Sequence, residues 1–553
     1  MNGAGQPPSG ETTDERLARA EARLARIEDY LQLDAGPSAV APSPDAARRK
    51  ADELELRVGQ NWFASLGILV LVIGVAFTLA LPYAGLPAAV PSLIGYGAAA
   101  ALFLLARAWR RTFELVSGNL RGAAMALLYF ATLRLCFFGD RHALSAASPA
   151  GQALLVLAVA LCLALALAWR SPCLTGIGLA AGYATALAVG EPWFVLVLLG
   201  VLASVCVIAG RRRGWPGFAL LGIGLTYSTY LLWAVGDPIL GRPFAVAAGP
   251  TASLGFLLAY ASILAAASWG RRAGGSEDAV ANLSALFNCG AAYGLFLAHS
   301  LVSFGPVFAP ANAAASLVFL GMAVVFWARQ RSPVETFVYA MTGYMALSFA
   351  IIRASEVPQV FIWLSLQSVV VVATAIWFRS RFIVVANFLI YAAIVVAYMA
   401  FARVETGISL IFGLVALGTA RLLNWQRGRL ELKTELMRNA YLASALVVFP
   451  YALYHLVPGA YVGLAWVATA LLYYGMNLIV RNRKYRWMGH STLLFTAIYL
   501  VVVGAGRLEP LYRNLSFLVL GSVLVIVSLI FTRLRARNAG SSRHARDAGG
   551  SAE

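Results

Sequence analysis

Long apolar runs dominate this chain. A membrane-spanning helix needs about 20 predominantly apolar residues, and about eighteen runs of the 553-residue sequence fit, several of them short. The first nine lie at roughly 63–81, 90–107, 122–138, 150–168, 172–189, 193–209, 216–235, 243–268 and 280–301. The second nine lie at roughly 308–328, 333–351, 358–377, 382–400, 407–424, 437–456, 460–480, 486–505 and 512–534. These runs predict an all-α, polytopic transmembrane bundle.

Basic residues test this division of the chain independently. Arginine and lysine gather in alternate connections, for example at Arg110, Arg170, Arg212, Arg379 and Arg483, and in the tail after the last run. A misplaced span would invert every later connection, yet the alternation holds along the whole chain. Because positive residues favour the cytoplasmic side, both termini are predicted to be cytoplasmic, in a bacterial inner membrane.

Composition excludes several classes of function. The net charge is +18, but the basic excess lies beside the apolar runs, so it suits lipid headgroups and topology rather than nucleic acid. The five cysteines lie in apolar runs without C-x-x-C spacing or a cysteine–histidine cluster, so we expect no metal and no cofactor. Neither a phosphate-binding loop nor a G-x-S-x-G elbow occurs, and we expect no enzymatic activity.

The N-terminal 60 residues are polar and lack a secretory signal. Between residues 15 and 33 the apolar positions Leu17, Ala20, Leu24, Ile27 and Leu31 follow a heptad, which favours a short coiled coil and a possible homodimer. A solvated single helix is the alternative. We expect a cytoplasmic helix at 1–34, a linker at 35–46, a juxtamembrane helix at 47–61, a transmembrane domain at 62–535 and a disordered cytoplasmic tail at 536–553.

The stretch ELELRVGQNWFASLGILVLVIGVAFTLAL, with Glu55, Gly59 and Trp62 before a glycine-punctuated first span, resembles a family of bacterial predicted membrane proteins, domain of unknown function 2339. The segments GNLRGAAMALLYFATLRL, RSPCLTGIGLAAGYATAL and EPWFVLVLLGVLASVCVIAGRRRGW are similar to later parts of that family. The resemblance implies many spans and an N-terminal coiled coil. It implies no reaction, ligand or catalytic residue.

Charged residues recur on the side predicted to be external. Arg134 lies near the outer end of its span, where it can extend to the interface, anchor an anionic lipid or substrate, or make a polar contact between helices. The other candidate outer-face residues are Asp140, Arg141, Arg353, Glu356, Arg403, Glu405, Arg507 and Glu509. These are either charge-balanced loops or a rim that recognises a zwitterionic or phosphate-bearing lipid.

Polar residues within the spans form a second set of candidates: Tyr227, Asn282, Asn288, Gln367, Tyr454 and His455. Such groups either join helices by hydrogen bonds or line a substrate pathway. Pro450, just before Tyr454 and His455, predicts a kinked helix there. Ser332, Pro333 and Glu335 are typical of a helix start, with Ser332 as the N-cap.

The partners we expect are membrane lipids and a possible second copy of the chain, with no nucleic acid. The function we favour is the handling of an amphipathic cell-envelope component, a lipid or lipid-linked molecule, or the scaffolding of its machinery. The alternative is a transporter that passes a small solute through the bundle. A groove open to lipid favours the first function, and a closed polar cavity near the midplane favours the second.

Overall fold

A computed structural model gives the fold of the chain. It describes residues 89–111, 114–138, 144–235, 252–269, 276–302, 305–330, 332–401, 407–425, 435–480, 482–504 and 509–549, and isolated positions between 68 and 87. The predicted N-terminal helix, linker and juxtamembrane helix lie outside the described residues, as does most of the first expected span. The chain divides into two compact units, Met1–Ala158 and Val159–Glu553, with the boundary inside α6 (Pro149–Ala168).

In the first unit, α4 (Val90–Ala108) and α5 (Glu114–Phe137) pack as a helical hairpin. Ala99 and Leu127 are buried where the two helices meet. The hydroxyl of Tyr96 lies 2.9 Å from that of Thr132, and Ser117 donates to the Ala106 carbonyl at 2.7 Å. Hydroxyl bonds of this kind join helices without an exposed polar group.

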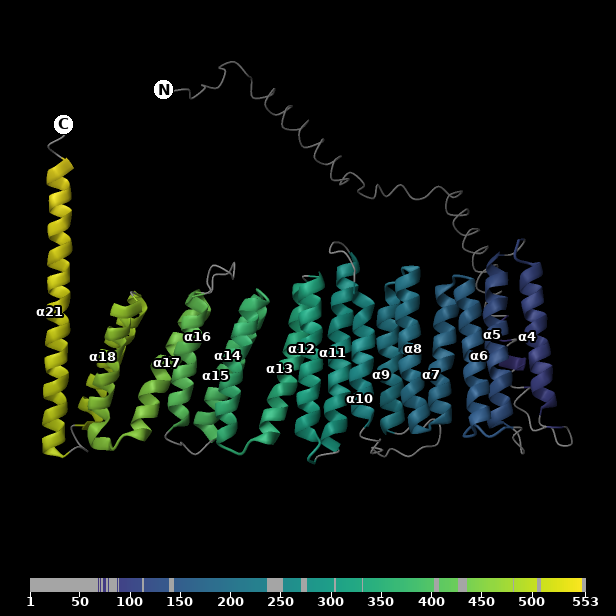
Figure 1. The fold of residues 1–553 in the computed structure, drawn as a ribbon, viewed down its shortest axis with the longest axis horizontal. Coiled ribbons are helices and arrows are strands. Elements are labelled where there is room, and N and C mark those ends of the chain that lie inside the picture. The colour runs from purple at the N-terminus through teal and green to yellow at the C-terminus, as the bar shows by residue number, and fades with distance from the viewer. Residues whose placement is uncertain are drawn as a thin grey trace, which may run out of the picture. The chain divides into compact units, whose positions relative to one another are not determined.

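The second unit contains the remaining helices (Figure 1). These are α7 (Pro172–Val189), α8 (Pro192–Arg213), α9 (Gly217–Val235), α10 (Ala252–Ala265), α11 (Ser276–Val302), α12 (Phe308–Gln330), α13 (Pro333–Ala354), α14 (Gln359–Trp377), α15 (Arg381–Phe401), α16 (Ile408–Trp425), α17 (Glu435–Leu456), α18 (Val462–Val480), α19 (Arg483–Tyr499) and α21 (Pro510–Gly549). The described residues contain no strand.

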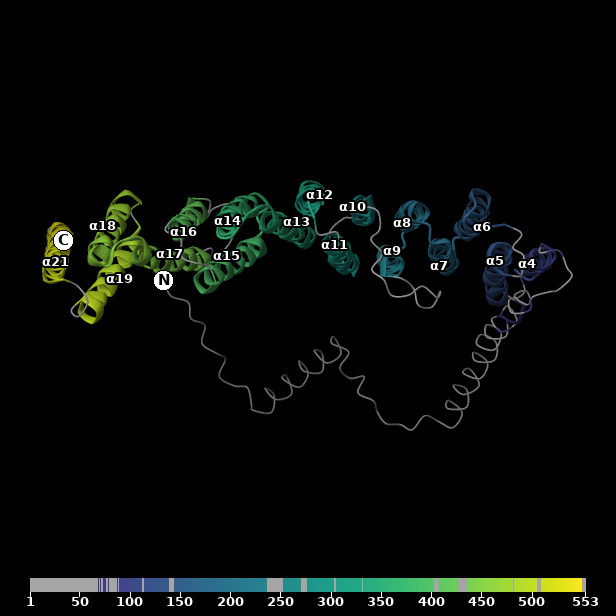
Figure 2. The ribbon, with the colours of Figure 1, turned by 90° about the horizontal axis from the view of Figure 1, so that it is seen from below.

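Helices of the second unit contact mainly the helices one and two places along the chain. As a result they form two layers, with α7, α9, α11, α13, α15, α17 and α19 in one layer and α8, α10, α12, α14, α16 and α18 in the other (Figure 2). We call these the odd layer and the even layer. Consecutive helices run in opposite directions, so all helices of one layer run the same way.

The predicted spans are confirmed wherever the structure describes them. Sixteen of the described helices are long and apolar enough to cross a membrane. A seventeenth expected span corresponds to a shorter apolar helix, Ala252–Ser268, and the residues before position 252 in that span are not described. The prediction of an all-α polytopic bundle is therefore confirmed.

The last helix is longer than the sequence suggested. It continues to Gly549, whereas the sequence pattern predicts a disordered tail at 536–553. Arg533, Leu534, Arg535, Ala536 and Arg537 are all good helix formers, and adding a residue to an existing helix needs no new nucleation. Both properties favour continuation of the helix beyond the apolar run.

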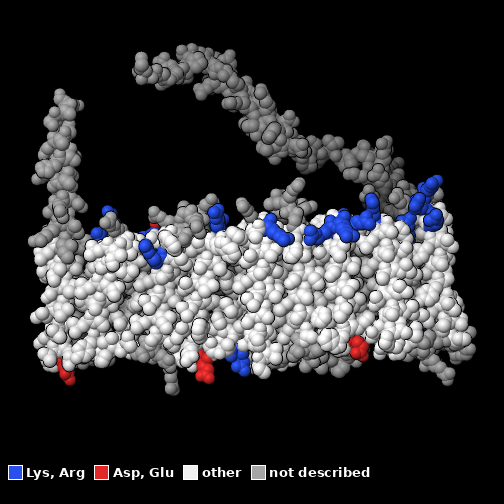
Figure 3. Space-filling view, in the orientation of Figure 1, with Lys and Arg blue, Asp and Glu red and all other residues white. Residues whose placement is uncertain are grey.

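Charge separates along the helix axes. Among the described residues, lysine and arginine gather at one set of helix ends (Figure 3), whereas Glu191, Glu356 and Glu509 lie at the other. In the second unit the first set includes Arg170, Arg211, Arg379, Arg381 and Arg483, and we call these helix ends the basic face. The connections between α8 and α9, α12 and α13, α14 and α15, and α18 and α19 lie there.

Candidate functional site

A buried hydrogen-bond node joins three helices of the odd layer. Tyr227 of α9 donates to Asn288 Oδ1 of α11 at 2.7 Å, and Asn288 Nδ2 donates to the Tyr339 hydroxyl of α13 at 2.9 Å. Asn288 Nδ2 also donates to the Ala261 carbonyl of α10 at 2.9 Å. All three side chains of the node are buried. Two of the predicted pathway residues, Tyr227 and Asn288, therefore bond to each other.

The hydrogen bonds of α13 and α15 follow a different pattern, because each of these helices bonds α14 in the even layer. Gln367 of α14 donates to the Tyr344 carbonyl of α13 at 2.8 Å and exchanges hydrogen bonds with Ser348. Asn387 of α15 donates to Ser368 Oγ of α14 at 2.8 Å and to the Tyr441 hydroxyl of α17 at 2.9 Å. In the odd layer, α13 and α15 are thus each hydrogen-bonded to α14 of the even layer.

A groove of about 420 Å³ lies between α13, α14 and α15. Its walls are apolar and include Met345, Ile352 and Ile390, which are exposed on the surface of the bundle. Its polar floor is formed by Ser348, Gln367, Ser368 and Asn387. Because exposed side chains line its rim, the groove opens sideways, onto a surface that faces lipid in a membrane.

The groove also has a direction. Its lining on α13 extends from Met341 to Ile352, about 16 Å at 1.5 Å per residue. Ile352 is at the end opposite the basic face, beside the exposed residues Arg353 and Glu356. The groove therefore ends at Ile352, which directly precedes Arg353 and lies four residues before Glu356, and neither charged residue lines it.

The other predicted residues lie apart from this groove. Arg134 is buried in α5 of the first unit, and Glu509 is exposed before α21. Asn282 is half-buried in α11. Tyr454 and His455 are exposed at the end of α17, where their rings lie 5.2 Å apart. Asp140, Arg141, Arg403, Glu405 and Arg507 lie outside the described residues.

Pro450 lies inside α17, as the sequence indicated, and its carbonyl accepts a hydrogen bond from the Trp466 indole at 3.0 Å. The predicted N-cap at Ser332 and the proline at the first position of α13 are also confirmed. However, the Ser332 side chain makes no capping hydrogen bond.

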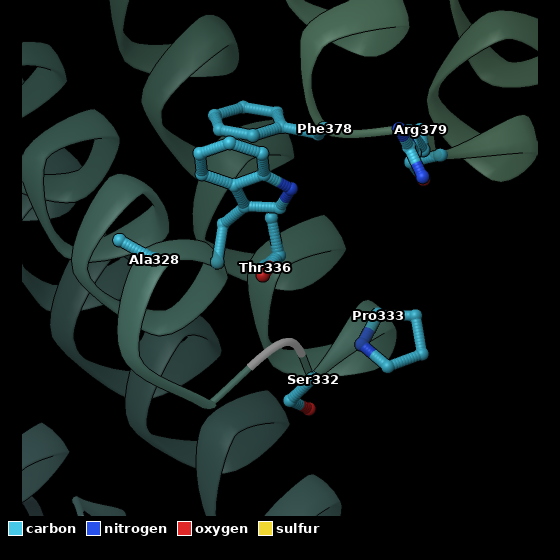
Figure 4. A pocket seen from close by; sticks show the side chains of 8 residues that line it. Ala328, Ser332, Pro333, Thr336, Phe378 and Arg379 are labelled. Atoms are coloured by element: carbon cyan, nitrogen blue, oxygen red, sulfur yellow. The ribbon is translucent and has the colours of Figure 1, made fainter. Parts of the chain in front are cut away.

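A second pocket, of about 410 Å³, lies at the basic face (Figure 4). It is formed by the end of α12 with Trp327, the start of α13 with Ser332 and Thr336, and the α14–α15 turn with Phe378, Arg379 and Ser380. Trp327 packs at 5.0 Å from Trp377 and 6.0 Å from Phe378. These rings hold the ends of α12 and α14 together and make one wall aromatic.

Two hydroxyls of this pocket lack hydrogen-bond partners. Thr336 is 2% exposed and Ser380 is 6% exposed, and no described residue bonds Thr336 Oγ1 or Ser380 Oγ. Elsewhere on α13 the Thr342 hydroxyl donates to the Val338 carbonyl at 2.9 Å, the usual solution within a helix. Leaving such a group unpaired costs about 1–3 kcal/mol, so the pocket keeps unused bonding capacity.

Arg379 adds a positive charge to this pocket, and its backbone adopts an unfavourable conformation. Its φ is 52°, and the Ser380 amide bonds the Ala375 carbonyl at 3.0 Å, the pattern of a Schellman motif. Gly190 and Gly214 adopt similar conformations without strain, whereas a side chain there costs about 1–2 kcal/mol. The chain therefore carries an arginine where glycine fits best.

Sequence reasoning missed this pocket and the hydrogen bonds of Asn387. One signal was available for Arg379: the α14–α15 turn is very short and contains no glycine, so another residue must adopt positive φ. No pattern in the sequence indicated that Thr336 and Ser380 would line one pocket, because they belong to different hairpins. Among the described residues no group of three or more histidine, cysteine, aspartate or glutamate side chains could hold a metal ion.

The fold and the charge distribution define a polytopic helical membrane protein. Residues 59–453 match the family described as predicted membrane protein (DUF2339). The chain belongs to this family, as the resemblance in its first span indicated. No curated protein and no solved structure matches the chain.

Proposed function

We propose that this protein binds a lipid-like, amphipathic component of the cell envelope in the groove between α13, α14 and α15, and that it acts by binding rather than by catalysis. The observation that carries the proposal is the lateral opening of the groove, where exposed apolar side chains surround a polar floor. An apolar chain can enter such a groove directly from the bilayer. A water-soluble solute gains little from apolar walls.

The two ends of the groove suit two parts of one molecule. An acyl or isoprenoid chain would lie along the apolar walls. A small hydrogen-bonding group could reach Gln367, whose Oε1 accepts one bond from Ser348 and can accept a second. Beyond the Ile352 end of the groove, Arg353 and Glu356 could contact a zwitterionic headgroup with both charges. One ligand would thus contact a polar residue within a span and charged residues of the predicted outer face.

Native mass spectrometry of the full chain, extracted in a mild detergent, tests this function. Met345→Trp should fill the groove and remove most of the retained ligand. Leu317→Trp is the matched control, because Leu317 is exposed on α12 and lines no part of the groove. We expect the unmodified protein and the control to retain the same amphipathic molecule, identified by fragmentation.

Three results would contradict the proposal. They are the absence of any retained molecule, equal retention by both variants, and retention of a water-soluble solute. The third result would favour the transporter instead.

A further inference from the structure

The pocket at the basic face carries a separate inference. Thr336 and Met345 are nine residues apart, which is two and a half helical turns, so they project from opposite sides of α13. The pocket and the groove are therefore distinct, and the inference does not rest on the proposed function.

We propose that this pocket binds a phosphate group, carried either by a phospholipid headgroup or by a soluble phosphate. Arg379 supplies a permanent positive charge. The unpartnered hydroxyls of Thr336 and Ser380 supply two donors that no described residue uses. A phosphate accepts several hydrogen bonds at once and suits this set better than a neutral ligand does.

The start of α13 adds to the attraction. α13 is 22 residues long, and its first turn lies at the pocket through Ser332. The Ser332 side chain does not cap the helix, so the amides of Val334 and Glu335 receive no acceptor from it, whereas Pro333 has no amide hydrogen. The positive end of a helix dipole stabilises a bound anion. Glu335, the acidic residue of this turn, does not line the pocket.

The aromatic wall and the position of the pocket suit a lipid phosphate. The pocket lies at helix ends, where spans of this length would meet the headgroups, and Trp327 and Phe378 offer apolar surface beside the polar groups. Aromatic rings are enriched at this depth. A free phosphate would use the same charge and hydroxyls without the rings.

The molecule contains a matched control turn. Arg170, between α6 and α7, has a φ of 56° and the same closing bond, from the Ser171 amide to the Ala166 carbonyl. There, however, Ser171 caps α7 by accepting a bond from the Leu174 amide at 3.4 Å. Arg170→Gly and Arg379→Gly thus remove the same charge and relieve the same strain, so both variants should fold.

The test measures binding of phosphatidylglycerol to the delipidated full chain in detergent by native mass spectrometry. Diacylglycerol, which has the same tails and no phosphate, is the ligand control. We expect Arg379→Gly to weaken phosphatidylglycerol binding about tenfold, the loss of one charge-assisted hydrogen bond. Arg170→Gly should stay within about twofold, because an exposed charge acts weakly at a distance. Diacylglycerol binding should not change.

A second variant tests the hydroxyls. Thr336→Val keeps the shape of the side chain and should weaken phosphatidylglycerol binding about tenfold, as expected for one hydrogen bond to an ionised phosphate oxygen. Thr469→Val is its control, since the Thr469 hydroxyl bonds its own helix at the Ala465 carbonyl. Inorganic phosphate separates the two sources: if it competes at millimolar concentration the ligand is a soluble phosphate, and if it does not the ligand is a lipid.

Equal weakening by Arg379→Gly and Arg170→Gly would overturn the proposal, because it would reflect the general charge of the basic face. Equal binding of phosphatidylglycerol and diacylglycerol would also overturn it, because only the tails would then be recognised.

Discussion

Asn288 and Gln367 are both buried amides of the second unit, yet their surroundings differ. Asn288 lies in the odd layer and bonds side chains of α9 and α13, its neighbours in that layer. Gln367 lies in the even layer and bonds the backbone and a serine of α13. The first arrangement closes the space between odd helices. The second ties α13 to α14 and leaves a groove between α13 and α15.

The difference shows how one kind of side chain can serve packing or binding. In a membrane, helices gain little from apolar burial, so polar groups and close contacts decide which of them touch. Asn288 is 1% exposed and is enclosed by its partners on α9, α10 and α13, so a ligand cannot reach it. Gln367, in contrast, lines the groove between α13 and α15, and its Oε1 can accept one more hydrogen bond. It can therefore form part of the floor of a binding site.

The largest effect should come from Asn288→Leu. This change removes hydrogen bonds to Tyr227, Tyr339 and the Ala261 carbonyl and leaves two tyrosine hydroxyls unpaired. At about 0.6–1.7 kcal/mol for each bond in a membrane, we expect a loss of roughly 2–4 kcal/mol. Thermal unfolding of the purified protein in detergent, followed by circular dichroism, would measure it.

Tyr227→Phe is the control within the node, because it removes a single bond. It should cost less than half as much as Asn288→Leu. If the two variants unfold at the same temperature, Asn288 does not join the odd layer in the way described.

Sequence reasoning predicted the helices well and the groups they bring together poorly. Apolar runs and alternating arginines located the helices, because both signals are local. The partnership of Tyr227 with Asn288 spans 61 residues, and that of Asn288 with Tyr339 spans 51. Such pairs depend on the two-layer order of the helices, which hydropathy does not encode. For the same reason Gln367 was identified as a candidate while its groove was not.

The next effect concerns the wall of the groove. Gly343 lets α13 approach α12 closely, and a Cβ there would lie 2.8 Å from Leu320 Cγ and 3.1 Å from the Leu320 backbone nitrogen. Gly343→Val should therefore destabilise the protein by about 1–3 kcal/mol through overpacking, and it should displace α13 relative to the groove.

Gly321→Val on α12 is the control, since a Cβ at position 321 would meet no atom within 4 Å. Thermal unfolding of both variants, with native mass spectrometry of the retained ligand, would separate a loss of stability from a loss of the groove. If Gly321→Val is as harmful as Gly343→Val, helix propensity rather than close packing explains the cost.

The smallest effect on stability should come from Gln367→Leu. The amide bonds only α13, and a leucine would meet the apolar side chains Met345 and Ile390 that already line the groove. We expect a cost of about 1 kcal/mol or less, well below that of Asn288→Leu. Ligand retention should fall nonetheless, because the floor of the groove would lose the Gln367 Oε1 acceptor. Unfolding temperature and retained ligand are therefore expected to separate: Asn288→Leu lowers mainly the first, and Gln367→Leu mainly the second. If Gln367→Leu destabilises the protein as strongly as Asn288→Leu and leaves the ligand in place, then Gln367 is a packing residue and the two regions do not differ in function.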